Sequence, residues 1–213
     1  MVGQQGQNRG PASGFRLMPG HLSVESQAEL VAEAFRAADD SPFYRPIVPG
    51  GRRMSVEMTN LGAVGWVSDP TGYRYAARHP VTARPWAAIP ALLIDLWREV
   101  TGAAHDPDCC LVNLYRDGAR MGLHQDRDEA DFSFPVLSVS LGDTAVFRLG
   151  GVTRGSPTRG LRLASGDVCV LEGAGRLVFH GIDRVLEGSS RLIPGGGRLN
   201  LTLRRARPAV AVF

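Results

Sequence analysis

The chain has 213 residues, of which 44% are hydrophobic and 21% charged. This length suffices for one well-buried core and is short for two, so we expect one domain spanning 15–205. No stretch approaches the roughly 18 consecutive apolar residues of a membrane-spanning helix, and the start of the chain lacks the apolar core of a signal peptide. The sequence therefore predicts a soluble protein that acts without a membrane. We also expect a monomer.

The cysteine content indicates the cellular compartment, whereas the charge does not identify a binding partner. The formal net charge is +3, and all 24 basic residues are arginine. Arginine suits phosphate recognition, but a complete absence of lysine is explained more simply by a GC-rich coding bias. The three cysteines are odd in number, and Cys109 and Cys110 are neighbours, which is a poor arrangement for disulfides. We expect reduced thiols and a cytoplasmic location.

The first half of the chain predicts two helices separated by a loop-rich region. Residues 1–14, rich in Gly and Gln, form a predicted disordered leader. A capping box at Ser26 and Glu29 predicts a helix that ends near Ala38. Its predicted buried residues are Leu30, Val31, Ala34 and Phe35.

Residues 41–86 follow as turns and a hairpin, with β-prone runs at Met54–Thr59 and Gly72–Ala76. A second helix begins with Pro90 in its first turn and ends at Gly102. Its apolar residues recur at helical spacing and belong to a core: Leu92, Leu93, Leu96, Trp97 and Val100.

From residue 109 onward the pattern changes to short alternating strands divided by glycine-rich turns. About eight strands at this spacing predict a mainly β fold with flanking helices, a double-stranded β-helix or jelly roll buttressed by the two helices. The predicted strands are Cys110–Tyr115, Met121–Asp126, Val136–Leu141, Ala145–Leu149, Gly160–Leu163, Asp167–Leu171, Leu177–His180 and Arg198–Arg204.

Three residues among these strands form a candidate metal site. On a strand, residues i and i+2 point to the same face, so His124 and Asp126 can present an imidazole and a carboxylate side by side. His180 would complete a facial triad of two histidines and one carboxylate. Such a triad is typical of a redox-active iron that keeps coordination positions open.

The last strand predicts a site for an anion. Alternation places three leucines on one face and Arg198, Asn200, Thr202 and Arg204 on the other. If the leucines face the helices, the arginines point into the barrel, where burial is costly unless an anion meets them. A dicarboxylate would supply that anion, and Asn113 with Tyr115 would offer it neutral hydrogen bonds.

Several motifs together resemble the AlkB family. They are Asn113-Leu114-Tyr115, residues 123–129 (LHQDRDE), residues 136–142 (VLSVSLG), Phe179-His180-Gly181-Ile182 and residues 198–204 (RLNLTLR). Upstream, Met58-Thr59-Asn60, Gly65-Trp66 and Gly72-Tyr73-Arg74-Tyr75 resemble the nucleotide-recognition region of bacterial AlkB. The resemblance covers about nine tenths of the chain and is strongest over 109–205. It implies a nucleotide-recognition region with supporting helices at 15–108, a catalytic core at 109–205 and a tail at 206–213.

The resemblance implies an Fe(II)- and 2-oxoglutarate-dependent dioxygenase, with O2 as the second co-substrate. His124, Asp126 and His180 would hold the iron. Arg198 would form a bidentate pair with the distal carboxylate of 2-oxoglutarate. The full 2-oxoglutarate set would be Asn113, Leu114, Tyr115, Arg198, Asn200 and Arg204. The enzyme would hydroxylate N-methyl groups on damaged bases such as N1-methyladenine and N3-methylcytosine, releasing formaldehyde, succinate and CO2 in direct-reversal DNA repair.

The same resemblance implies a partner, alkylated single-stranded DNA or RNA, and five residues that would contact it. Trp66 would stack on the extruded base opposite His124. Tyr73 and Tyr75 would contact the phosphate side, Asp128 the polar edge of the base, and Arg154 a backbone phosphate. Each has a structural alternative: Trp66 as a packed indole, the tyrosines as a cross-strand pair, and Asp128 and Arg154 as solvated loop charges.

Two other functions remain open from the sequence. The dioxygenase could act on a protein side chain or a small metabolite, in which case the aromatic residues upstream would serve packing. Alternatively, the chain could be a non-catalytic jelly roll that binds a metal or an anion. The arginines of the last strand argue against the second alternative, because a simple metal-binding module has no need of them.

Overall fold

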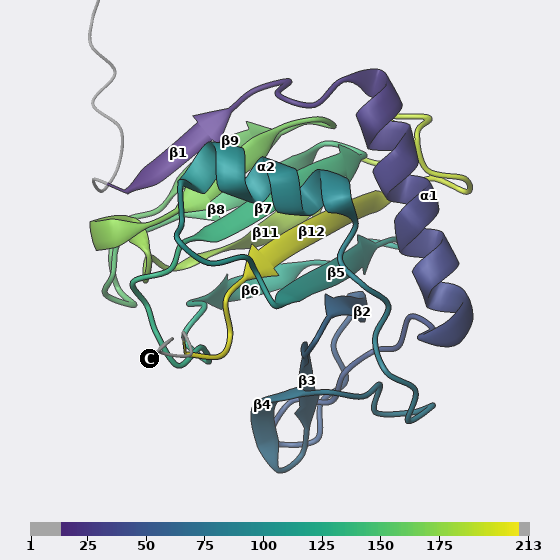
Figure 1. Cartoon of the computed structure of the whole chain (residues 1–213). Coiled ribbons are helices and arrows are strands. Elements are labelled where there is room, and N and C mark those ends of the chain that lie inside the picture. Colours follow the sequence, from purple (N-terminus) through teal and green to yellow (C-terminus); the bar gives the residue numbers. More distant parts are fainter. Residues whose placement is uncertain (1–13, 209–213) are drawn as a thin grey trace, which may run out of the picture.

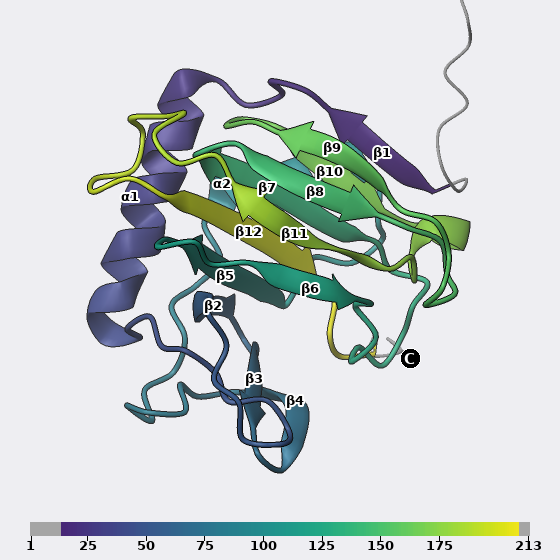
Figure 2. The same ribbon diagram turned by 180° about the vertical axis from the view of Figure 1, so that it is seen from behind.

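The computed structural model describes residues 14–208, and two antiparallel sheets form its centre (Figure 1). The larger sheet has the strand order β1 (Phe15–Met18), β10 (Val168–Leu171), β7 (Val136–Gly142), β12 (Arg198–Arg204), β5 (Cys109–Tyr115) and β2 (Glu57–Gly62). The smaller sheet, in front in Figure 2, has the order β6 (Met121–His124), β11 (His180–Val185), β8 (Ala145–Leu149) and β9 (Arg159–Leu163). The predicted double-stranded β-helix is confirmed.

Two helices cover the outer face of the larger sheet, as predicted (Figure 1). Helix α2 (Ala91–Thr101) follows Pro90 and ends at Gly102, whose φ of 61° is a left-handed conformation suited to glycine. Leu93, Leu96 and Trp97 of this helix share one buried cluster with the leucines of β12. The leucine face of β12 therefore meets the helices, which leaves the polar face for the space between the sheets.

Helix α1 (Val24–Asp40) begins two residues before the predicted start and ends two after the predicted end. Ser23, not Ser26, is the N-cap, and its hydroxyl accepts a hydrogen bond from the backbone N of Ser26. Phe35 is only partly buried, and Ala37 takes its place among the buried residues. The buried stripe runs through positions 30, 31, 34 and 37, and position 35 lies at its flank.

Several strand boundaries differ from the prediction. Strand β6 ends at His124, so Asp126 lies in the following loop, and β11 begins at His180 where a strand was predicted to end. Strand β2 lies three residues downstream of the predicted run 54–59. The short strands β1 and β3 (Gly65–Asp69) were not predicted, and β3 pairs with β4 (Gly72–Ala76). Short strands depend on their neighbours in the sheet, and local sequence shows those poorly.

The region upstream of residue 109 shares its core with the region downstream. Strands β1 and β2 lie at the two edges of the larger sheet, whereas hairpin β3–β4 projects beside β2 (Figure 1). None of the helices within 14–208 is long and apolar enough to cross a membrane. The predicted leader, apart from Gly14, and the tail beyond residue 208 lie outside the described residues.

Candidate active site

The two histidines of the predicted triad face each other across paired strands. His124 is the last residue of β6 and His180 the first of β11, and the two are direct partners in the strand register. Gly181 makes this close pairing possible, because a Cβ at that position would lie 2.6 Å from the backbone O of Met121. The close approach of β6 therefore leaves room only for glycine at the position after His180.

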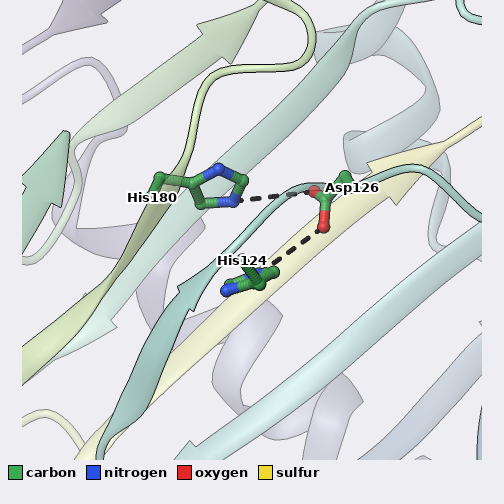
Figure 3. Close-up of side chains that lie close together, drawn as sticks. All are labelled: His124, Asp126 and His180. Atoms are coloured by element: carbon green, nitrogen blue, oxygen red, sulfur yellow. Dashed lines mark ion pairs between the residues drawn. The ribbon is translucent and has the colours of Figure 1, made fainter. Parts of the chain in front are cut away.

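The loop after β6 brings Asp126 against both imidazoles (Figure 3). Nε2 of His124 lies 3.6 Å from Oδ1 of Asp126, and Nε2 of His180 lies 3.8 Å from Oδ2. One ligand atom from each residue lies within 4.8 Å of the other two. Two imidazole nitrogens and a carboxylate oxygen at these separations fit a single metal ion bound on one face.

Hydrogen bonds orient both imidazoles for ligation. Nδ1 of His124 lies 2.9 Å from the backbone O of Gly122, and Nδ1 of His180 lies 3.0 Å from that of Val178. A carbonyl can only accept, so each Nδ1 carries the proton and each Nε2 keeps a free lone pair. Burial lowers the pKa of His180 to about 4, which keeps this ring neutral.

The carboxylate of Asp126 is held ionised by its surroundings. Burial alone would raise its pKa, but the positive charge of Arg204 outweighs that effect and holds the pKa well below the usual range. Nη2 of Arg204 forms an ion pair with Oδ1 at 2.8 Å. Asp126 and His180 are therefore in the protonation states that a metal requires.

A polar cavity lies between the sheets next to the triad. Its polar lining is Asn113, Tyr115, Arg198, Asn200, Thr202 and Arg204, together with Ser138 and the triad itself. The polar face of β12 thus points into the barrel as alternation predicted. Among the described residues, Oδ1 of Asn113 and both Nε and Nη1 of Arg198 are buried without a hydrogen-bond partner. A fully buried guanidinium with two free donors fits a bound carboxylate.

Leu114 departs from the predicted 2-oxoglutarate set. Its side chain belongs to the cluster that packs against the helices, whereas its neighbours Asn113 and Tyr115 line the cavity. Successive residues of a strand point to opposite faces, so Leu114 can offer the cavity only its backbone. Ser140, for which no role was predicted, accepts a 2.9 Å hydrogen bond from Nη2 of Arg198. This serine lies within the quoted motif 136–142, but the motif did not distinguish it from its neighbours.

A second, more open cavity of about 530 Å³ adjoins the first. His124, Asp126 and Arg204 line both, so the candidate metal site lies at their junction. Four of the five predicted substrate residues line the second cavity: Trp66, Tyr73, Asp128 and Arg154.

Contacts within the protein fix the side chains of Trp66 and Arg154 in this cavity. Nε1 of Trp66 donates a 2.8 Å hydrogen bond to Oδ2 of Asp128, and the Trp66 ring stacks on Tyr73 at 5.5 Å with 19° between the planes. The guanidinium of Arg154 lies 5.1 Å from the centroid of the Phe179 ring.

Tyr75 does not line this cavity. Its hydroxyl donates a 2.6 Å hydrogen bond to Oε1 of Glu129, and its ring packs against Val64, Cys109 and Ala206. Tyr73 and Tyr75 share one face of β4, but Tyr73 stacks on Trp66 whereas Tyr75 meets Glu129 and the buried cluster. The side chain supports the hairpin from within, and a substrate contact for Tyr75 stays a prediction.

Glu129 and Arg176 are two further polar residues that sequence reasoning missed. Glu129 stands in an acidic run that resembles a solvated loop, yet its side chain is 1% exposed. Arg176 donates from Nη1 to the backbone O of Asp126 over 2.7 Å and from Nη2 to Oε2 of Glu129 over 2.9 Å. Nothing in the local sequence around Arg176, a single arginine in a glycine-rich loop, indicates that it contacts Asp126 and Glu129.

Comparison with known proteins agrees with this geometry. The family model for the 2OG-Fe(II) oxygenase superfamily matches residues 14–204. The AlkB homolog of Caulobacter vibrioides, called an alpha-ketoglutarate-dependent dioxygenase, is 62% identical over 92% of this chain and 89% of its own length. Escherichia coli AlkB is 42% identical over 87% of each chain. The solved structure of OsALKBH1 superposes with a TM-score of 0.75 at 30% identity, covering 90% of this chain and 97% of that one. The chain belongs to the AlkB family of the 2OG-Fe(II) oxygenase superfamily.

Proposed function

We propose that this protein is an Fe(II)- and 2-oxoglutarate-dependent dioxygenase that demethylates N-alkylated bases in single-stranded DNA, with RNA as a second candidate polymer. The observation that carries the proposal is the pair of adjoining cavities that meet at the triad and share His124 and Asp126. One cavity offers a buried arginine to a small carboxylate, and the other offers an aromatic plate and a carboxylate to a larger ligand. Curated AlkB relatives named as dioxygenases support the same reaction class.

The cofactor and co-substrate would be held by distinct residues. His124, Asp126 and His180 would hold Fe(II) through two imidazole nitrogens and one carboxylate oxygen. Iron with bound 2-oxoglutarate and O2 supplies the oxidising chemistry, which ends in succinate, CO2 and a hydroxylated methyl group. Arg198 would receive the distal carboxylate of 2-oxoglutarate on its two free donors, since its third contact is already made with Ser140.

The remaining polar residues of the first cavity complete this pocket. Asn113 and Asn200 would contribute neutral hydrogen bonds, and Arg204 would add positive charge at the boundary with the second cavity. Burial raises the pKa of Tyr115 to about 12, so its hydroxyl stays protonated and can donate to a carboxylate oxygen. The pocket therefore offers donors and positive charge where a dicarboxylate needs them.

The second cavity supports a nucleobase as the substrate. Trp66 would stack on a base turned out of its strand, and Tyr73 would support the indole from the other side. The carboxylate of Asp128, already oriented by the indole N–H, would favour a cationic methylated base. Arg154 stands at the same cavity and would contact a backbone phosphate.

A hydroxylase of a protein side chain or a small metabolite is the alternative. An oligonucleotide carrying one N1-methyladenine separates the two, when it is incubated with the protein, Fe(II), 2-oxoglutarate and O2. We expect mass spectrometry to show the oligonucleotide lighter by one CH2 unit, with one formaldehyde formed per repaired base. An unchanged oligonucleotide, with 2-oxoglutarate consumed in the presence of a peptide or metabolite, would favour the alternative.

The proposal also covers the division of the chain into regions, its oligomeric state and its compartment. Residues 15–108 would form the nucleotide-recognition region and 109–205 the catalytic core. Action as a monomer is also part of the proposal. Three free, buried cysteines support a reducing compartment such as the cytoplasm.

A further inference from the structure

A buried carboxylate, that of Glu129, joins three parts of the molecule. Oε1 accepts a 2.6 Å hydrogen bond from the hydroxyl of Tyr75, and Oε2 accepts one of 2.9 Å from Nη2 of Arg176. Nε of Arg204 lies 3.6 Å from Oε1. These partners belong to hairpin β3–β4, to the segment before β11 and to β12. Glu129 is thus a meeting point of elements far apart in the sequence.

Two routes lead from Glu129 to the metal ligand Asp126. Through Arg176 it reaches the backbone, because Nη1 of that arginine donates to the O of Asp126 over 2.7 Å, and Nε donates to the O of Phe134 over 2.8 Å. Through Arg204 it reaches the side chain, because Nη2 of that arginine forms a 2.8 Å ion pair with Oδ1 of Asp126. Both the backbone and the side chain of Asp126 are therefore held in place.

The charges of this cluster balance only with Glu129 present. Arg176 and Arg204 are positive, Asp126 and Glu129 are negative, and all four side chains are buried. Without Glu129, two buried guanidinium groups would share the one carboxylate that the metal also draws upon. An unpaired buried charge is costly, so the arginines would shift toward another anion or toward solvent.

The same loop holds the hairpin at two adjacent residues. Trp66 and Tyr75 are direct partners in the register of β3 and β4. The indole of Trp66 donates to Asp128, and the hydroxyl of Tyr75 donates to Glu129. Burial raises the pKa of Tyr75, so its hydroxyl remains a donor at neutral pH. The position of the Trp66 plate therefore depends on both carboxylates.

We propose that Glu129 is a positioning residue that fastens the base-stacking hairpin and the 2-oxoglutarate pocket to one carboxylate. It acts through Tyr75 on the hairpin and through Arg204 on the pocket, and its side chain, 1% exposed, lies in the wall of the second cavity. The hairpin half of this role rests on the proposed nucleic-acid substrate. The pocket half rests only on the binding of 2-oxoglutarate.

The pocket half is tested without nucleic acid. Calorimetry would measure 2-oxoglutarate binding with redox-silent Mn(II) in place of Fe(II). Glu129→Gln keeps the shape but replaces a charged acceptor with an amide, and we expect its Kd for 2-oxoglutarate to rise about tenfold. Tyr75→Phe should leave that Kd unchanged. Asp131→Asn is the matched control, because Asp131 lies in the same loop but caps only the backbone N of Ser133.

The hairpin half is tested with a methylated oligonucleotide. Tyr75→Phe should raise its Kd about fivefold to tenfold by removing a hydrogen bond to a charged group. At saturating oligonucleotide the variant should turn over at the wild-type rate, a split that general destabilisation would not produce. Because Tyr75 acts through Glu129, Tyr75→Phe should cost less in the Glu129→Gln background than in the wild type.

The outcomes separate this proposal from the proposed substrate. Wild-type affinity for 2-oxoglutarate in a folded Glu129→Gln variant overturns it, and so does an equal cost of Tyr75→Phe in both backgrounds. If Glu129→Gln fails to fold, the single Tyr75→Phe variant decides, and unchanged oligonucleotide binding overturns the proposal. If the wild type binds no methylated oligonucleotide, the substrate assignment is wrong, while the 2-oxoglutarate measurement still supports or overturns the link to Arg204.

Discussion

The indole N–H of Trp66 donates a 2.8 Å hydrogen bond to the carboxylate of Asp128, so the predicted stacking residue and the predicted polar contact form one unit. Tyr73 stacks on the indole from β4, which fixes the plane of the ring. Trp66 is therefore a preorganised plate, and base stacking on it requires little additional ordering. Its neighbour Asp128 carries two tasks, orienting the indole and presenting negative charge to the base.

Replacing Trp66 by Ala should weaken binding of a methylated oligonucleotide by about 1–3 kcal/mol, as for other base–aromatic stacks. Fluorescence anisotropy would measure this loss. Decarboxylation of 2-oxoglutarate in the absence of substrate should stay close to the wild-type rate, because the indole lies outside the first cavity. A variant that loses both activities alike would show that Trp66 supports the fold and not the substrate.

The two tasks of Asp128 can be separated by two substitutions. Asp128→Asn keeps an oxygen that can accept from the indole N–H but removes the charge. It should therefore lower repair of cationic N1-methyladenine more than repair of neutral alkylated bases. Asp128→Ala removes both functions and should also weaken oligonucleotide binding in general. Equal losses on cationic and neutral bases in the Asn variant would contradict the electrostatic role.

Arg198→Ala should raise the half-saturating concentration of 2-oxoglutarate by about a hundredfold, equivalent to roughly 3 kcal/mol, since it removes a charge-assisted partner from a sheltered carboxylate. Steady-state kinetics at varied 2-oxoglutarate would show this, and the half-saturating concentration of oligonucleotide should change little. Arg198→Lys should restore only part of the loss because an ammonium lacks the planar fork. An unchanged 2-oxoglutarate requirement in Arg198→Ala would place the co-substrate elsewhere.

Arg154→Ala should weaken oligonucleotide binding to a similar degree for every sequence. The slope of log K against log salt concentration should fall in magnitude by about 1, as expected when one phosphate contact is lost. Titrations at several salt concentrations measure that slope directly. Since Arg154 also lies over the Phe179 ring, a melting temperature serves as the control for lost packing. An unaltered slope with a lowered melting temperature would assign Arg154 to packing alone.

Sequence patterns predicted the elements whose residues alternate or recur regularly. The bounds of β12 were predicted to the residue, because leucines and polar residues alternate along all of it and each face meets a different environment. The triad was predicted from residue types and spacing, although its premise was partly wrong. Asp126 reaches the histidines from a loop that Arg176 and Arg204 hold in place, and not from the strand of His124.

Contacts between segments far apart in the chain could not be predicted in this way. Glu129 in an acidic run resembles a solvent-exposed residue, and only the approach of Tyr75, Arg176 and Arg204 makes it a buried one. Tyr73 and Tyr75 look equivalent in the sequence, yet one lines a cavity and the other packs inside, because they differ in the elements they face. Tertiary contacts determine whether such side chains are buried, and local sequence patterns do not reveal those contacts.

The most direct test of the central claim is the release of formaldehyde from an oligonucleotide carrying N1-methyladenine, measured in metal-controlled buffer together with succinate. With Fe(II), 2-oxoglutarate and O2, the wild-type protein should form formaldehyde and succinate in equal amounts, and omission of Fe(II) or 2-oxoglutarate should stop both. His124→Ala, Asp126→Ala and His180→Ala should each abolish the reaction, because each removes one of the three candidate iron ligands. Formaldehyde release that continues in any of these variants, or in the absence of 2-oxoglutarate, would contradict the assignment.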